Sequence, residues 1–146
     1  MFYFLISFAG IVSTLVMTLF SHLVEMITGE KLNEAHLINL LIDRSKLSMK
    51  ITRNHILGWL IHCVIGILMV FGLFLYQDQN ASLPMHVHGL CMGLALGGLG
   101  TLGWWLILSF HPNVPENNWI LFFGQLMVAH LIFALTATFF LKTLMA

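Results

Sequence analysis

Four long apolar stretches alternate with short polar ones along the 146 residues of the chain. They cover about residues 2–24, 55–76, 88–110 and 119–141, and each holds the roughly 20 residues that a helix needs to cross a bilayer core. Helices also satisfy their backbone polar groups internally, as hydrocarbon requires. The pattern predicts an all-α fold: an integral membrane bundle of four transmembrane helices, antiparallel and up-and-down, in a single membrane domain over residues 1–146.

Composition supports a membrane protein and excludes nucleic-acid binding. Hydrophobic residues make up 59% of the chain and charged residues 8%, against roughly 45–50% and about 25% in soluble domains. Six basic residues balance six acidic ones, so the chain lacks the positive charge with which proteins bind phosphate backbones. The lipid bilayer is the expected partner.

The connection at residues 29–54 predicts the orientation. It contains five of the six basic residues: Lys31, Arg44, Lys46, Lys50 and Arg53. By the positive-inside rule this loop is cytoplasmic and both termini are outside, in a multi-pass protein of the bacterial inner (cell) membrane. The N-terminal run has no basic residue before it, which favours a retained span over a signal peptide. Within the loop, the apolar residues Leu37, Ile38, Leu40, Leu41 and Ile42 are typical of an interfacial helix on the membrane surface, with a plain linker as the alternative.

Small residues mark two helix faces. One face has small residues at intervals of four: Gly89, Gly93, Gly97 and Thr101. Gly58, His62 and Gly66 repeat that spacing in the preceding span. Small residues four apart allow two helix backbones to approach closely. We therefore expect these faces to contact each other, either within the chain or across a homo-oligomer, or to serve assembly into a larger membrane complex.

Eight histidines are unusual in so apolar a chain, and His62 and His130 lie well inside predicted spans. Ionisable groups at that depth are costly and are functional candidates. Paired histidines in a membrane bundle are consistent with haem b ligation. With a rise of 1.5 Å per residue, however, the depths of His62 and His130 differ by about 7 Å. The structural alternative is a hydrogen bond from each ring to a neighbouring helix.

Other histidines suggest a divalent metal site or a proton path. His22 and Glu25 share a helical face, and His86 and His88 stand near Asp78 at the start of the third span. Zinc takes about four such ligands, whereas two solvated histidines at a helix start would need no metal. Imidazole can also relay protons, with His62 and His130 as relay points.

Catalytic motifs are missing from the sequence: it contains no G-x-S-x-G, H-E-x-x-H or phosphate-binding loop. The segments "GIVSTLVMTLF", "ILGWLIHCVIGILMVFG" and "HGLCMGLALGGLG" resemble a family of small four-helix bacterial inner-membrane proteins of unknown function. The resemblance covers nearly the whole chain and marks Gly58, Trp59 and His62. It implies a fold and an inner-membrane location but no reaction.

The leading hypothesis is a small, non-enzymatic inner-membrane protein with a packing, assembly or accessory role. The first alternative is a haem b or metal-binding electron carrier that uses His62 and His130, with help from His22 or His88. The second alternative is the transport of protons or small solutes.

Overall fold

The computed structural model describes residues 1–46, 49–79 and 84–144, without the side chains of 2, 77–79 and 144. Within the described residues, five helices follow one another: α1 (Phe2–Thr28), α2 (Glu34–Arg44), α3 (Ile56–Gln79), α4 (Met85–Phe110) and α5 (Trp119–Leu144). All of them except α2 are long and apolar enough to cross a membrane. The predicted all-α bundle of four candidate transmembrane helices is therefore confirmed.

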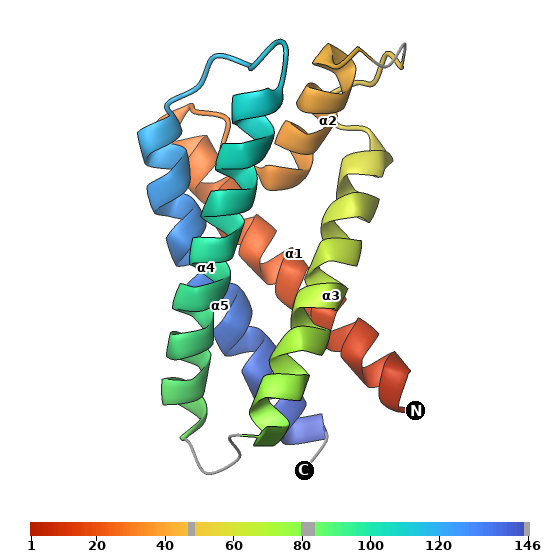
Figure 1. Cartoon of the computed structure of the whole chain (residues 1–146), viewed down its shortest axis with the longest axis vertical. Coiled ribbons are helices and arrows are strands. Elements are labelled where there is room, and N and C mark those ends of the chain that lie inside the picture. The colour runs from red at the N-terminus through yellow and green to blue at the C-terminus, as the bar shows by residue number, and fades with distance from the viewer. Residues whose placement is uncertain (47–48, 80–83, 145–146) are drawn as a thin grey trace.

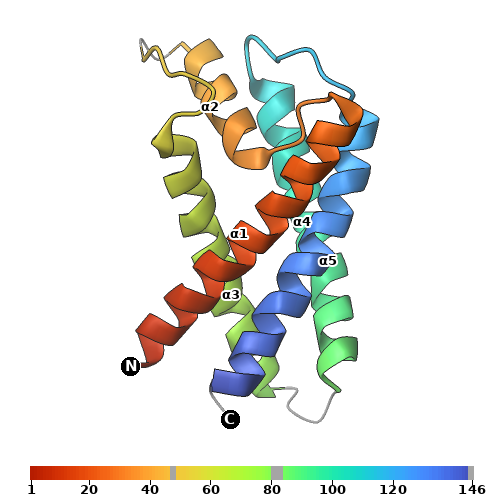
Figure 2. The ribbon, with the colours of Figure 1, turned by 180° about the vertical axis from the view of Figure 1, so that it is seen from behind.

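The four long helices run alternately up and down, so that α1 begins and α5 ends at the same end of the bundle (Figure 1). The short helix α2 lies at the opposite end, beside the connection between α4 and α5. Seen from behind, α1 runs obliquely across α3 and α5 (Figure 2). Helix α4 packs along α5, and α1 packs on both α3 and α5, whereas α3 and α4 make little contact.

The glycines of α4 face α5. A Cβ added to Gly89 would lie 2.8 Å from a methyl group of Leu135, and one added to Gly93 would lie 2.8 Å from Leu131 Cα. One added to Gly97 would lie 2.9 Å from Met127 Sδ. This face therefore lets two helices of the same chain approach closely.

The glycines of α3 face other helices. A Cβ on Gly66 would overlap the hydroxyl of Thr14 on α1, and one on Gly58 would overlap the carbonyl oxygen of Ala35 on α2. The expectation that the glycine faces of α3 and α4 meet within the chain is therefore wrong. The spacing identified helix faces that need small residues, but it carried no information about which helix each one meets.

Helix α2 packs into the end of the bundle and is neither a linker nor a helix with its apolar face free. Its first turn is capped by Asn33, whose side chain accepts a hydrogen bond from the backbone of His36. Ala35 and Leu37 are fully buried, and α3 is its main neighbour. The apolar residues of this loop thus cover the ends of other helices, which a short apolar run between charges cannot reveal.

Candidate functional site

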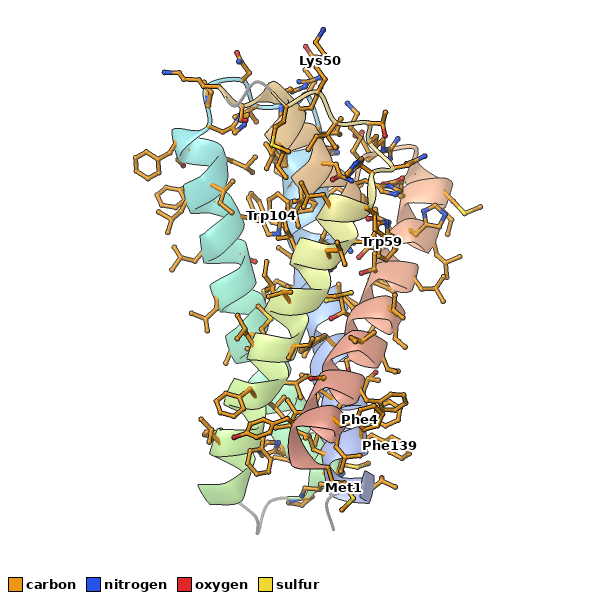
Figure 3. All side chains as sticks on the ribbon, turned by 90° about the vertical axis from the view of Figure 1, so that its right-hand side faces the viewer. Met1, Phe4, Lys50, Trp59, Trp104 and Phe139 are labelled. Carbon is orange, nitrogen blue, oxygen red and sulfur yellow. The ribbon has the colours of Figure 1, made fainter. Side chains whose placement is uncertain are left out.

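A cavity of about 390 Å³ lies between α3 and α4 and is also lined by residues of α2. All five helices contribute to its lining, which is mostly apolar and includes Ile38, Ile65, Met69, Leu99 and Phe133. Its polar lining residues are Thr14, Glu34, His62, Trp104 and His130. Trp104 extends inward from α4 (Figure 3). An apolar cavity with a few polar groups is the usual form of a small-molecule site.

His130 presents one ring nitrogen without a protein partner. Its Nδ1 lies 2.9 Å from the carbonyl oxygen of Leu126, one turn earlier on α5. A carbonyl only accepts hydrogen bonds, so Nδ1 carries the proton and, in a neutral ring, Nε2 is left as an acceptor. Gly100 packs against the ring, since a Cβ there would lie 2.7 Å from Nε2. The absence of a side chain at Gly100 makes room for the imidazole.

His62 lines the same cavity from α3 and is 8% exposed. Its Nε2 is buried and has no hydrogen-bond partner. His62 and His130 thus line one cavity from two different helices. The depth difference expected from residue counting therefore does not keep His62 and His130 apart, because the helices are tilted relative to one another (Figure 2).

Glu34, at the start of α2, is a fully buried carboxylate that also lines the cavity. Its Oε1 accepts a hydrogen bond of 2.7 Å from Ser21 of α1 and one of 3.4 Å from Gln125 of α5. The same Gln125 amide donates to Ser21. Glu34 Oε2 has no partner. Burial raises the pKa of Glu34 to about 7, and the hydrogen bond from Ser21 opposes this shift.

The sequence pattern did not identify Glu34, Ser21 and Gln125 as site residues. Ser21 is one of several hydroxyl residues in the first span, Gln125 is an isolated amide in the last one, and Glu34 sits in a polar loop. A lone glutamine within a predicted span was the one available signal, because an amide in hydrocarbon needs partners. Its partner Glu34 is 91 positions away along the chain.

Glu25 does not join the cavity and instead fastens the turn between α1 and α2. Its Oε2 accepts hydrogen bonds of 2.9 and 3.0 Å from the backbone of Leu32 and Asn33, and its Oε1 is paired with Arg53. His36 Nδ1 lies 4.0 Å from the same carboxylate. Burial and the positive charge of Arg53 lower the pKa of His36, although Glu25 opposes the shift.

The remaining predicted ligands are scattered. His22 packs edge-on against the His36 ring at 6.5 Å. His86 is exposed, whereas His88 is fully buried against Tyr76, with ring centroids 5.3 Å apart. Both lie within the first turn of α4, not in an irregular segment before it. The side chain of Asp78 lies outside the described residues.

The described residues contain no group of three or more His, Cys, Asp or Glu side chains arranged to hold a metal ion. Thr101, expected on the α4 packing face, has a buried hydroxyl without a partner. Of the predicted haem or metal ligands, His62 and His130 are the two that line the cavity.

The chain matches no family model, no curated protein and no solved structure. Four long apolar helices packed in a bundle define a small multi-pass membrane protein. The resemblance noted in the sequence is consistent with this class and identifies no family.

Proposed function

We propose that this membrane protein binds a lipid-soluble small molecule in the cavity between α3 and α4. The observation that carries the proposal is an apolar cavity of about 390 Å³ into which all five helices contribute, with two buried polar atoms, His62 Nε2 and Glu34 Oε2, that lack partners in the protein. Unpartnered buried polar atoms cost free energy, and a ligand that pairs with them recovers it. The mostly apolar lining favours a ligand with an apolar body.

Assembly through the glycine faces is less well supported as the main role. Helix α5 of the same chain already packs against Gly89, Gly93 and Gly97. An accessory role in a larger complex, the inner-membrane location and the cytoplasmic position of residues 29–54 stay predictions. The binding proposal is compatible with each of them.

The cavity can be filled from Gly103, which lines it and has no atom within 4 Å of an added Cβ. Gly103→Phe should displace the ligand. Gly98→Phe is the matched control, since Gly98 lies on the same helix, is exposed and has equally open space around an added Cβ. Organic extraction and mass spectrometry of the proteins purified in mild detergent should detect a molecule that is retained by the parent chain and Gly98→Phe but lost from Gly103→Phe. Equal extracts from all three would refute the proposal.

Haem is a second candidate because His62 and His130 line one cavity and His130 Nε2 is free as a ligand atom. Neutral imidazole is a common axial ligand of haem iron. A visible spectrum of the oxidised and reduced protein tests this candidate. A Soret band that shifts on reduction and disappears in His62→Ala and His130→Ala supports haem, and a colourless sample excludes it.

A further inference from the structure

We propose that Glu34 makes the cavity a site for a lipophilic organic cation, and that a proton competes with this cation for the same carboxylate. This inference deepens the proposed function and rests on it. Its basis is geometric: a fully buried carboxylate lines a mostly apolar cavity, and one of its oxygens has no partner.

No cationic side chain that the structure describes forms an ion pair with Glu34. Among the described residues, the carboxylate with cationic partners is Glu25, which faces Arg53 and His36. A carboxylate removed from water without an opposite charge is strongly disfavoured. Two events can neutralise Glu34: it can take up a proton, or a cation can enter the cavity beside it.

The walls of the cavity decide what kind of cation fits. Small hydrated ions would lose their water against side chains such as Ile65, Leu99 and Phe133. A cation with an apolar body would bury that body against the same walls. Trp104 adds an aromatic face, which attracts cations.

The route of entry is lateral. Helices α3 and α4 make little contact, and the cavity residues Ile65, Leu99 and Ile107 on these two helices are also exposed on the outside of the bundle. In a four-span membrane protein that outer surface faces lipid. A molecule dissolved in the bilayer can therefore reach the cavity between α3 and α4.

The surroundings of Glu34 keep both its protonation states accessible. Ser21 and Gln125 donate hydrogen bonds to Oε1, and the N-terminus of α2 favours negative charge. Burial and the nearby charge of Glu25 act in the opposite direction. The resulting pKa of about 7 lets a proton and a cation exchange near neutral pH.

Other titratable groups face the cavity and must be separated from Glu34. His62 on α3 and His130 on α5 line it, and protonation of either ring would also repel a cation. Glu25 on α1 acts on Glu34 through its charge. These groups are present in both the parent chain and Glu34→Gln, so the difference between the two isolates Glu34.

The test uses radiolabelled tetraphenylphosphonium and equilibrium dialysis of the full chain in detergent. Competition with one proton at a pKa of about 7 predicts that the affinity rises about tenfold from pH 6 to pH 8. Glu34→Gln should lose binding, and Glu34→Asp should retain part of it. Glu116→Gln, which removes an exposed carboxylate from the connection between α4 and α5, next to Lys31, should bind as the parent chain does.

A neutral apolar fluorophore, N-phenyl-1-naphthylamine, separates this inference from the function on which it rests. If the fluorophore binds, and Gly103→Phe but not Gly98→Phe blocks it, while tetraphenylphosphonium binding is absent or unchanged by Glu34→Gln, the cavity binds ligands and the cation inference is wrong. If neither probe binds the parent chain, both proposals fail. Thermal unfolding of each variant shows that lost binding does not reflect a lost fold.

Discussion

Asn39 of α2 holds the first turn of α3 through Gly58. The side-chain oxygen of Asn39 accepts a hydrogen bond of 2.8 Å from the backbone of Gly58, and its amide donates to the carbonyl oxygens of Arg53 and His55 at 2.9 and 2.6 Å. One buried side chain thus satisfies three backbone groups where α3 begins. This contact fixes the position of α2 above the cavity.

Gly58→Ala should loosen this contact. The added Cβ would overlap the carbonyl oxygen of Ala35 and lie 2.8 Å from the Asn39 side chain, so α2 must move. Overpacking of this kind costs about 1–3 kcal/mol, which a lower thermal unfolding temperature in detergent would report. Gly72→Ala on the same helix has open space around its Cβ and should have almost no effect. Equal effects of the two changes would show that α2 is not held in this way.

The double change Gly93→Leu and Gly97→Leu should separate α4 from α5 within one chain. Their added Cβ atoms would lie 2.8 Å from Leu131 Cα and 2.9 Å from Met127 Sδ, and the rest of each leucine has no room there. We expect a loss of roughly 2–6 kcal/mol of folding free energy with no change in the molecular mass of the assembly, measured by light scattering. The matched control is the double change Gly98→Leu and Gly103→Leu, because a Cβ added at either position has no atom within 4 Å. A change in oligomeric state with unchanged stability would instead support the assembly role.

Glu34 should make the protein less stable as the pH rises. Its pKa is about 7 in the fold against 4.5 for the free side chain, so the unfolded chain releases this proton first. Stability therefore falls as the pH rises from about 4.5 to about 7 and levels off above that range, by about 3 kcal/mol in all. Glu34→Gln removes this part of the pH dependence and should be the more stable protein at pH 8.

The comparison with Glu34→Gln is needed because His36 changes the pH dependence of stability in the opposite direction. The pKa of His36 is lowered in the fold by burial and by Arg53, so its contribution to stability is lost as the pH falls. Unfolding curves of both proteins between pH 4 and 8.5 separate the two groups. If the stability of the parent chain and of Glu34→Gln changed with pH in parallel, Glu34 would not be the cause of this pH dependence.

Glu25→Ala should destabilise the protein more than Arg53→Ala does, although the two side chains form an ion pair. Glu25 also accepts hydrogen bonds from the backbone of Leu32 and Asn33, and leaving them unpaired costs about 1–3 kcal/mol. Arg53 is 41% exposed, and surface ion pairs contribute about 0–1 kcal/mol. Denaturant or thermal unfolding of both variants shows which one loses more stability. A larger loss of stability in Arg53→Ala would contradict this prediction.

The sequence predicts the spans of this protein well because each transmembrane helix is a local pattern. A run of about 20 apolar residues carries its own signal, and the helices lie where the runs are, with ends extended by a few residues. Which helices pack together is harder to predict. Gly66 requires a close neighbour, but the residues around it in the sequence do not indicate that this neighbour is Thr14. The site is harder still, because Glu34 acquires its chemistry only when α1 and α5 bury it.

The order of synthesis decides when Glu34 gains its hydrogen-bond donors. Ser21 of α1 and Glu34 of α2 leave the ribosome before Gln125, which belongs to α5. Until α5 takes its place between α1 and α4, the carboxylate has only the serine as a donor. The insertion of α5 therefore completes a polar contact that α1 and α2 begin, and a chain truncated before α5 would lack the amide that Gln125 donates to Glu34.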